Sequence, residues 1–420
     1  MKRIKFLLTN RKQCFLTIAV LMLVQFVFAT PKPEKQPSVY KHRMGELNVK
    51  TKPGAKVIVE QVAHEFWFGC AIPNSFVDGS MPETDKKQFE EKFLQNFNSA
   101  VTENALKWGT MERQKGRPDY SVIDGILAWT EANQIPIRGH NLFWGIPQFI
   151  QPWVKELSDE DLELTIKNRA KTVAARYKGR FVEYDLNNEM VHGNYYEERL
   201  GADITKKMAE WSQTGDPEIK LWLNDYDIPT GKKLPEYLAQ IRLMLGQGVP
   251  VAGIGVQGHL HAETFDRHQV KNALDSLAQF NLPIRVTEFN MPGQRSKYYA
   301  DRKLKLTDEE EKIKAKELVD YYKICFAHPA VEGILMWGFW EGANWIPVSS
   351  LYKRDWSPTP SAEAYKNLIY NEWWTKAEAK TNKKGELSVP AFFGKYKVTV
   401  NGITKEIDLT KASGKVVVEF

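Results

Sequence analysis

The chain has 420 residues, of which 43% are hydrophobic and 26% are charged. This length is enough for one large domain with a deep core and a small addition beside it, and the composition is that of a soluble globular protein. Five Lys and Arg residues among the first 12 account for most of the net charge of +6. The remainder of the chain is near +1, so the charge gives no reason to expect a nucleic-acid partner.

Residues 1–29 have the pattern of a secretory signal peptide. The basic start is followed by an almost wholly apolar run from Cys14 to Ala29, and Val27-Phe28-Ala29 offers a small-residue cleavage site. The apolar run is short for a membrane span, although an uncleaved signal anchor is the alternative. We therefore expect a secreted or periplasmic protein with no stable membrane insertion after cleavage.

Only two cysteines follow the expected signal peptide, Cys70 and Cys325. They lie far apart in sequence within apolar stretches, which favours two buried free thiols over a disulfide. Two such residues cannot form a zinc framework.

From about residue 65 to residue 372, short β-rich runs alternate with longer amphipathic stretches. Eight such units predict an α/β fold, a closed parallel (β/α)8 TIM barrel. The alternative is a doubly wound open sheet, which normally has a Gly-rich phosphate loop that this sequence lacks. The predicted strands are His64–Ala71, Ser99–Glu103, Ile135–Asn141, Val182–Asn187, Ile219–Asn224, Ala252–Gln257, Pro283–Glu288 and Glu332–Gly338. The predicted helices are Thr84–Asn96, Val122–Asn133, Ser158–Tyr177, Leu234–Leu245, His268–Ala278 and Asp308–Phe326.

The two ends of the chain have a different sequence pattern. Short runs alternate apolar and polar residues and are separated by turns such as Asn401-Gly402. Each end is too small to fold alone, so we expect them to pack together as a small accessory β-layer beside the barrel. The predicted organisation is a signal peptide over 1–29, an N-terminal β segment over 30–62, the barrel over 63–375 and a C-terminal β segment over 376–420.

Polar residues gather at the carboxyl ends of the predicted strands, which in a barrel converge on one face where active sites lie. Glu189 and Glu288 each close a run that should be buried. Hydrolysis of a glycosidic acetal needs a carboxylic acid and a second carboxylate, so this pair is a candidate catalytic pair. A structural ion pair is the alternative for either residue.

Other polar and aromatic residues near these strand ends can also be explained by a structural role instead of a functional one. Lys107 follows Glu103 by four residues, which suits a helical salt bridge. A lone histidine is usually a satisfied core group, and no metal-binding spacing is present. Any of the 13 tryptophans can pack in the core, although a flat indole also suits a sugar ring.

Six ordered motifs resemble glycoside hydrolase family 10, and in particular its endo-1,4-β-xylanases of the plant-type branch, which bacteria also possess. The resemblance runs from about residue 40 to the C-terminus. The motifs are Val101-Thr102-Glu103-Asn104-Ala105-Leu106-Lys107-Trp108, Arg138-Gly139-His140-Asn141-Leu142-Phe143-Trp144, Asp185-Leu186-Asn187-Asn188-Glu189, Asn224-Asp225-Tyr226, Gly255-Val256-Gln257-Gly258-His259 and Thr287-Glu288.

The resemblance implies a retaining enzyme with Glu189 as general acid/base, Glu288 as nucleophile and His259 hydrogen-bonded to Glu288. It implies a xylan or xylo-oligosaccharide substrate. Protons and one ester suffice for this chemistry, so we expect no cofactor and no metal, and we expect a monomer. In a retaining enzyme the two carboxyl groups lie about 5–5.5 Å apart. The implied substrate-binding residues are Glu103, Asn104, Lys107, His140, Trp144, Asn188, Gln257, His259, Trp337 and Trp345.

The chain departs from the common family pattern in the loop after Trp144, where Gly145-Ile146-Pro147-Gln148 replaces the usual His and Gln. This loop leaves the chain-length preference open. Two alternatives also stay open: the same mechanism on another β-glycan or on short xylo-oligosaccharides, and a secreted carbohydrate-binding protein without turnover.

Overall fold

The computed structural model describes residues 38–260 and 262–420. The predicted signal peptide and the start of the predicted N-terminal β segment lie outside the described residues. Within the described part of the chain, no helix is both long enough and apolar enough to span a membrane.

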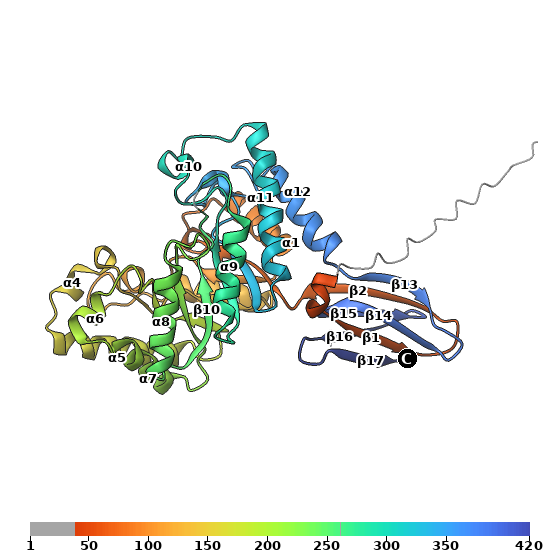
Figure 1. The fold of residues 1–420 in the computed structure, drawn as a ribbon, viewed down its shortest axis with the longest axis horizontal. Coiled ribbons are helices and arrows are strands. Elements are labelled where there is room, and N and C mark those ends of the chain that lie inside the picture. The colour runs from red at the N-terminus through yellow and green to blue at the C-terminus, as the bar shows by residue number, and fades with distance from the viewer. Residues whose placement is uncertain (1–37, 261) are drawn as a thin grey trace, which may run out of the picture. The chain divides into compact units, whose positions relative to one another are not determined.

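The centre of the fold is a closed barrel of eight parallel strands in the described part of the chain (Figure 1). The strands follow one another in sequence order around the barrel, and the last closes against the first, with Leu335 opposite Gly69. The predicted TIM barrel and its eight strands are therefore confirmed. The strands are β3 (Trp67–Ile72), β4 (Ser99–Thr102), β5 (Ile137–Gly139), β7 (Glu183–Asp185), β9 (Leu221–Asp225), β10 (Val251–Val256), β11 (Ile284–Phe289) and β12 (Val331–Met336).

A helix follows each barrel strand before the next strand begins. The six predicted helices are present, and the sequence analysis missed α7 and α12. At α5 the side chain of Ser158 caps the first turn, as its position before Asp159 and Glu160 indicates. The helices are α1 (Glu83–Asn96), α3 (Ser121–Ala132), α5 (Asp159–Arg176), α7 (Ile204–Gly215), α8 (Leu234–Gly246), α9 (Arg267–Ala278), α11 (Asp308–Ala327) and α12 (Pro360–Asn367).

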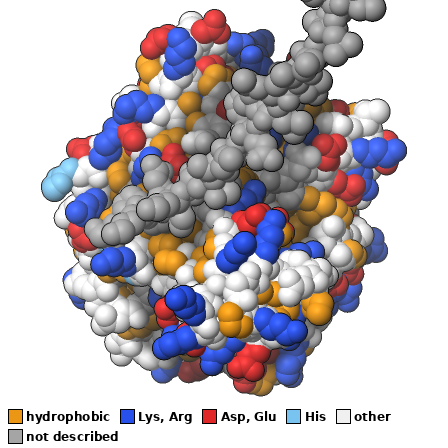
Figure 2. Space-filling model, turned by 90° about the vertical axis from the view of Figure 1, so that its right-hand side faces the viewer, with side chains coloured by type: hydrophobic (Ala, Val, Ile, Leu, Met, Phe, Trp, Pro, Cys, Tyr) orange, Lys and Arg blue, Asp and Glu red, His pale blue; other side chains and the backbone are white. Residues whose placement is uncertain are grey.

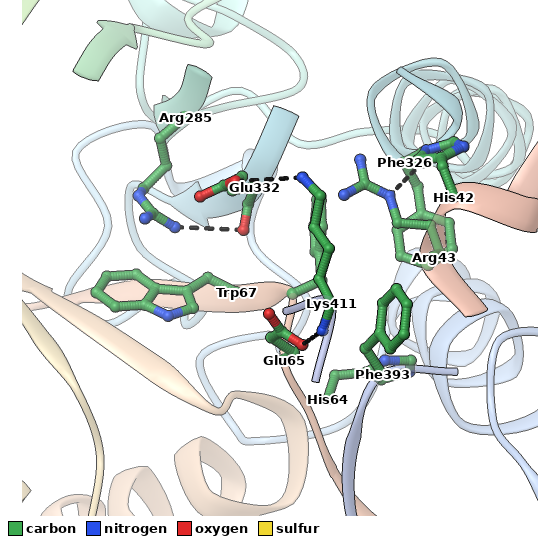
Figure 3. A pocket seen from close by; sticks show the side chains of 11 residues that line it. His42, Arg43, His64, Glu65, Trp67, Arg285, Phe326, Glu332, Phe393 and Lys411 are labelled. Carbon is green, nitrogen blue, oxygen red and sulfur yellow. Dashed lines mark hydrogen bonds and ion pairs between the residues drawn. The ribbon is translucent and has the colours of Figure 1, made fainter. Parts of the chain in front are cut away.

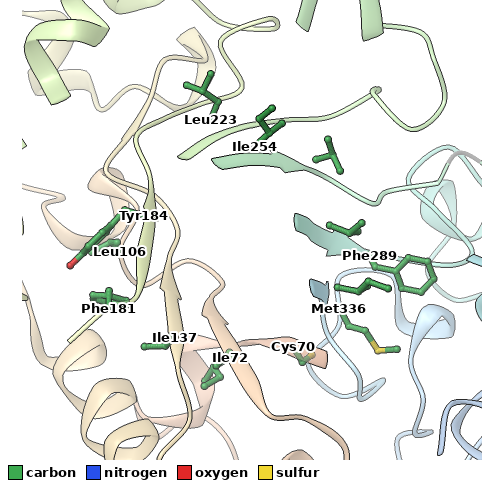
Figure 4. Packing of buried hydrophobic residues seen from close by; sticks show 14 of the residues in the cluster. Cys70, Ile72, Leu106, Ile137, Phe181, Tyr184, Leu223, Ile254, Phe289 and Met336 are labelled. Atoms are coloured by element: carbon green, nitrogen blue, oxygen red, sulfur yellow. The ribbon is translucent and has the colours of Figure 1, made fainter. Parts of the chain in front are cut away.

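Apolar side chains from the strands and the surrounding helices form one large core (Figure 4). Cys70 and Cys325 both lie in it as free, buried thiols, as predicted, and burial raises the pKa of each thiol. The candidate polar residues lie at the strand ends, outside this apolar core. The barrel therefore provides a rigid frame for a site at its rim.

The two ends of the chain pack together, as predicted, but they form two sheets rather than one layer. In the first sheet, β1 (Met44–Lys50) lies between β14 (Glu386–Phe392) and β17 (Lys415–Glu419). In the second, the order is β13 (Lys376–Lys380), β2 (Lys56–His64), β15 (Gly394–Val400) and β16 (Ile403–Leu409). Both sheets contribute to one small core that includes Leu47, Val59 and Val398. The accessory unit therefore has a core of its own.

The outward face of the four-stranded sheet carries a row of alternating charges. Lys376, Glu60, Lys397 and Glu406 lie opposite one another on successive strands. The view toward the accessory sheets likewise shows basic and acidic side chains interspersed (Figure 2). Such a face suits solvent better than it suits the stacking of sugar rings.

Arg43 joins the accessory unit to the amino-terminal end of the barrel. It is buried, and its guanidinium donates hydrogen bonds to the carbonyl oxygens of Phe326, His328 and Val331 at 2.9, 2.7 and 2.6 Å. These carbonyls lie where α11 ends and β12 begins, so one side chain supplies three hydrogen bonds to a buried turn.

A pocket lies beside Arg43 at this same end of the barrel (Figure 3). Its charged side chains already have partners: Lys411 of the accessory unit lies 3.6 Å from the carboxylate of Glu332, and Arg285 stacks on Trp67 at 4.0 Å. The pocket is therefore a junction between the two parts of the fold, at the opposite end of the strands from the candidate site.

Replacing Arg43 with Met should keep the aliphatic packing but remove the three hydrogen bonds that the guanidinium donates to buried carbonyl oxygens. We expect the free energy of unfolding to fall by about 2–4 kcal/mol, measured by urea denaturation. The matched control is Lys41→Met at an exposed position, which should change it by less than about 0.5 kcal/mol. Equal effects of the two substitutions would contradict the role of Arg43.

Candidate active site

Glu189 lies at the carboxyl end of the barrel, directly after the short strand β8 (Asn187–Asn188), which pairs with β6 (Phe143–Trp144). Its carboxylate accepts two hydrogen bonds, from Trp144 Nε1 and from Gln257 Nε2, both at 2.7 Å. Removal from solvent raises the pKa of Glu189, and the nearby charge of Glu288 raises it further. The two hydrogen bonds oppose this rise without cancelling it, so Glu189 tends to hold its proton.

Glu288 lies across the site at the end of β11 and is 4% exposed. Asn224 Nδ2 donates to its Oε1 at 3.1 Å, and His259 Nε2 lies 3.0 Å from its Oε2. Burial alone would raise the pKa of Glu288, but His140, His259 and Lys107 outweigh burial and lower it. Glu288 therefore tends to stay ionised, in contrast to Glu189.

Asn224 connects the two sides of the site, and the sequence analysis assigned it no role. Its Nδ2 also donates to Asn188 Oδ1 at 2.9 Å, and its Oδ1 accepts from Thr287 Oγ1 at 2.7 Å. Asn188 Nδ2 is buried and has no hydrogen-bond partner among the described residues. A free amide donor on the residue directly before Glu189 suits a ligand hydroxyl.

Polar and aromatic residues that follow β4, β5 and β12 line one side of the site. Lys107 Nζ donates to Asn104 Oδ1 at 2.9 Å and lies 4.8 Å from the ring centre of Trp144 and 5.8 Å from that of Trp337. Next to Lys107, burial raises the pKa of Glu103. This side of the site therefore presents an ammonium group, a carboxyl group and the flat apolar faces of two tryptophan rings.

The rings of Trp337 and Trp345 each contact a histidine of the site, edge-on and tilted respectively. Trp337 is 5.1 Å from the ring of His140, and Trp345 is 5.0 Å from that of His259. Asn290 supports this region, because its Oδ1 accepts from Trp345 Nε1 at 2.8 Å and lies 2.9 Å from His259 Nδ1. The structure thus brings together all twelve residues that the sequence analysis singled out.

A buried charge network below the rim supports His140. Asp185 Oδ2 lies 2.7 Å from His140 Nδ1, and Arg138 bonds to both Asp185 and Glu183. Arg285 completes the network with bonds to Glu183 at 2.8 and 3.1 Å. Burial would raise the pKa of Asp185, but Arg138 and His140 lower it, so the barrel interior holds an ionised carboxylate that fixes His140.

The unusual loop after Trp144 adds an aromatic residue that the sequence analysis missed. Phe149, at the end of a short 3-10 turn over Pro147–Phe149, stacks on the Trp144 ring at 4.1 Å while remaining 49% exposed. The loop that breaks the common pattern thus supports the indole that bonds to Glu189. No group of three or more potential metal ligands occurs among the described residues.

A comparison with known families agrees with this geometry. The family model described as glycosyl hydrolase family 10 matches residues 58–383, most of the chain. This chain belongs to glycosyl hydrolase family 10. The family resemblance of the six motifs is thereby confirmed.

Two curated relatives of this family 10 chain are each 34% identical to it. The anti-sigma-I factor RsgI6 of Acetivibrio thermocellus aligns over 357 residues, covering 84% of this chain and 44% of that protein. Endo-1,4-beta-xylanase 1 of Arabidopsis thaliana aligns over 378 residues, covering 87% of this chain and 36% of that protein. The chain thus spans less than half the length of either relative.

Solved structures have the same fold. Xylanase 10B from Thermotoga petrophila RKU-1, crystallised in complex with xylobiose, has a TM-score of 0.64 at 24% identity, over 73% of this chain and 95% of that one. Native xylanase 10B from Thermotoga maritima also has a TM-score of 0.64, at 24% identity, over 73% and 96%.

Replacing Gln257 with Leu should raise the pKa of Glu189 further, because the carboxylate loses a hydrogen bond that stabilises its charge. The titration can be followed by NMR with ¹³C-labelled glutamate, assigned with Glu189→Gln. The control is Gln148→Leu, an exposed change of the same kind that should leave the titration unmoved. An unchanged or lower pKa of Glu189 in Gln257→Leu would show that this bond does not set its charge.

Proposed function

We propose that this family 10 protein is a retaining endo-1,4-β-xylanase that cleaves internal bonds of xylan by double displacement, with Glu189 as acid/base and Glu288 as nucleophile. One observation carries the assignment of roles: the surroundings of the two carboxyl groups move their pKa values in opposite directions. Such a divergence separates an acid from a nucleophile.

In the first step, the Glu288 carboxylate attacks the anomeric carbon and Glu189 gives its proton to the departing glycosidic oxygen. The bond to the leaving sugar breaks as the ester to Glu288 forms. The charge of Glu288 is then gone, so the ionised Glu189 can take a proton from water, which attacks the same carbon and releases Glu288. Protons and one ester suffice for this cycle, and the two inversions leave the anomeric configuration retained.

The residues around the carboxyl groups suit a chain of neutral sugars. Asn188 Nδ2 is the donor we assign to the 2-hydroxyl of the reacting sugar, a contact that strengthens in the transition state. Glu103, Asn104, Lys107, His140 and Trp144 would bind the glycone, while Trp337 and Trp345 would cover the sugar at the cleavage point. Gln257 and His259 would act through their hydrogen bonds to the two carboxyl groups.

Xylan is the favoured substrate because several similar proteins are named endo-1,4-beta-xylanases and because the six motifs resemble that activity. The signal-peptide pattern of residues 1–29 supports export to the periplasm or the medium, and we propose that the enzyme acts there as a monomer.

The test is to incubate the mature protein with arabinoxylan and with barley β-glucan and to follow the release of reducing ends. We expect release from xylan, lost by at least about 10⁴-fold in Glu288→Ala because the variant lacks the carboxylate assigned to form the ester. The control is Glu197→Ala at an exposed position of α6 (Tyr195–Leu200), which should keep full activity.

Each other result contradicts a separate part of the proposal. Activity on β-glucan alone would contradict the substrate, and full activity of Glu288→Ala would contradict the nucleophile. Binding of xylan without turnover by the unmodified protein would support a carbohydrate-binding role instead.

A further inference from the structure

The turn that carries Glu189 has an unusual backbone conformation. Glu189 has a φ of 60°, in the left-handed region that non-glycine residues rarely occupy. Its amide donates to the carbonyl of Asn224 at 2.9 Å, and its own carbonyl accepts from the amides of His192 and Gly193 at 3.0 and 2.9 Å. Such a conformation persists only where surrounding contacts enforce it.

Asp225 supplies those contacts from the neighbouring strand. It is fully buried at the end of β9, and its carboxylate accepts from Val191 N at 2.8 Å and from Tyr226 N at 2.9 Å. His192 Nδ1 lies 2.7 Å from the same carboxylate. Two of these three partners belong to the turn after Glu189, so Asp225 fastens that turn to the barrel.

His192 is held on more than one side. Its ring stacks on Tyr226 at 3.6 Å with an interplanar angle of 13°, and its Nε2 lies 4.0 Å from Asp227 Oδ2. Asp227 in turn accepts from Arg295 at 2.6 Å. Hydrogen bonding on one edge and stacking on one face leave the imidazole little freedom to turn.

We propose that Asp225 and His192 are positioning residues for Glu189, which together hold the acid/base carboxyl where it can protonate the leaving group. Neither residue needs to touch substrate for this role. The inference rests on the proposed function, because it assigns a task to residues that act through the acid/base.

The charge of Asp225 gives the pair a second effect. Its negative charge adds to the influences that raise the pKa of Glu189, after burial and Glu288. Burial raises the pKa of Asp225 itself, and the hydrogen bond and charge of His192 oppose that rise. The charged or titratable groups that face this pair are Glu189 on its own turn, Tyr226 and Asp227 after β9, Glu236 on α8 and Arg295 after β11.

The test compares two aryl β-xylobiosides, one with an unsubstituted phenol and one with 2,4-dinitrophenol as leaving group. Only the unsubstituted phenol needs a proton from Glu189 to depart, so kcat/KM on it reports the acid. We expect His192→Phe, which can keep the stacking on Tyr226 but not the hydrogen bond, to lose about 10- to 100-fold on the phenyl substrate. On the dinitrophenyl substrate it should lose less than about threefold, and Glu189→Ala should show the same pattern more strongly.

Two further variants separate positioning from a general loss of structure. His192→Asn, which can still donate to Asp225, should recover most of the activity on the phenyl substrate, and His268→Phe at an exposed position of α9 should match the unmodified protein on both. Asp225→Asn removes a negative charge near Glu189, so the alkaline limb of the kcat/KM profile should move to lower pH.

An equal loss on both substrates, or no loss on either, would overturn the positioning role while leaving the xylanase proposal intact. An alkaline limb that stays in place in Asp225→Asn would overturn the electrostatic effect. If the unmodified protein cleaved neither xylobioside, the proposed function itself would fail, and this inference with it.

Discussion

Two carboxyl groups buried at one end of a barrel cannot both be charged without cost, and the surroundings must decide which of them keeps the proton. Here Glu288 lies near Lys107, His140 and His259 and accepts a hydrogen bond from Asn224. Glu189 instead has two neutral donors, Trp144 and Gln257. Burial raises the pKa of Glu189 despite its two donors, whereas the neighbours of Glu288 outweigh burial and lower its pKa. The rest of the fold can be understood as the means of holding those neighbours in place.

The barrel interior provides that support with charge as well as apolar packing. Arg138, Asp185, Glu183 and Arg285 form a buried chain of ion pairs that ends at His140. A buried chain of this kind contributes little net stability, but removing one member would leave its partner as an uncompensated buried charge. Its use here is orientation, because it fixes the imidazole that faces Glu288 at 3.9 Å. The accessory sheets and Arg43 act at the other end of the strands, away from the site.

Much of this could be read from the sequence because the barrel imposes a simple pattern. Eight alternating strand and helix patterns indicated the closed sheet. Polar residues at the carboxyl ends of the predicted strands then indicated that Glu189 and Glu288 converge. Helix α7 was missed, although its buried Ile204, Met208 and Ser212 recur with helical spacing. The two-sheet form of the accessory unit was missed because strand pairing between distant ends leaves no local signal.

The directions of the pKa shifts could not be read from the sequence either, since they depend on which side chains meet in space. Asn224 and His192 lie within or beside the recognised motifs, yet their tasks follow only from contacts to residues on other strands. Phe149 was hidden for a different reason. It lies in the loop that departs from the family pattern, where the motifs give no guide to conformation.

The most direct test of the account is to trap the covalent intermediate. A 2-deoxy-2-fluoro xylobioside with dinitrophenol as leaving group should inactivate the protein. The fluorine slows both formation and hydrolysis of the ester, and the good leaving group speeds only its formation, so the ester accumulates. We predict a mass increase of one 2-deoxy-2-fluoroxylobiosyl unit, located on the peptide that carries Glu288. A label on Glu189, or steady turnover with inversion at the anomeric carbon and no label, would contradict the assignment of the two carboxyl groups.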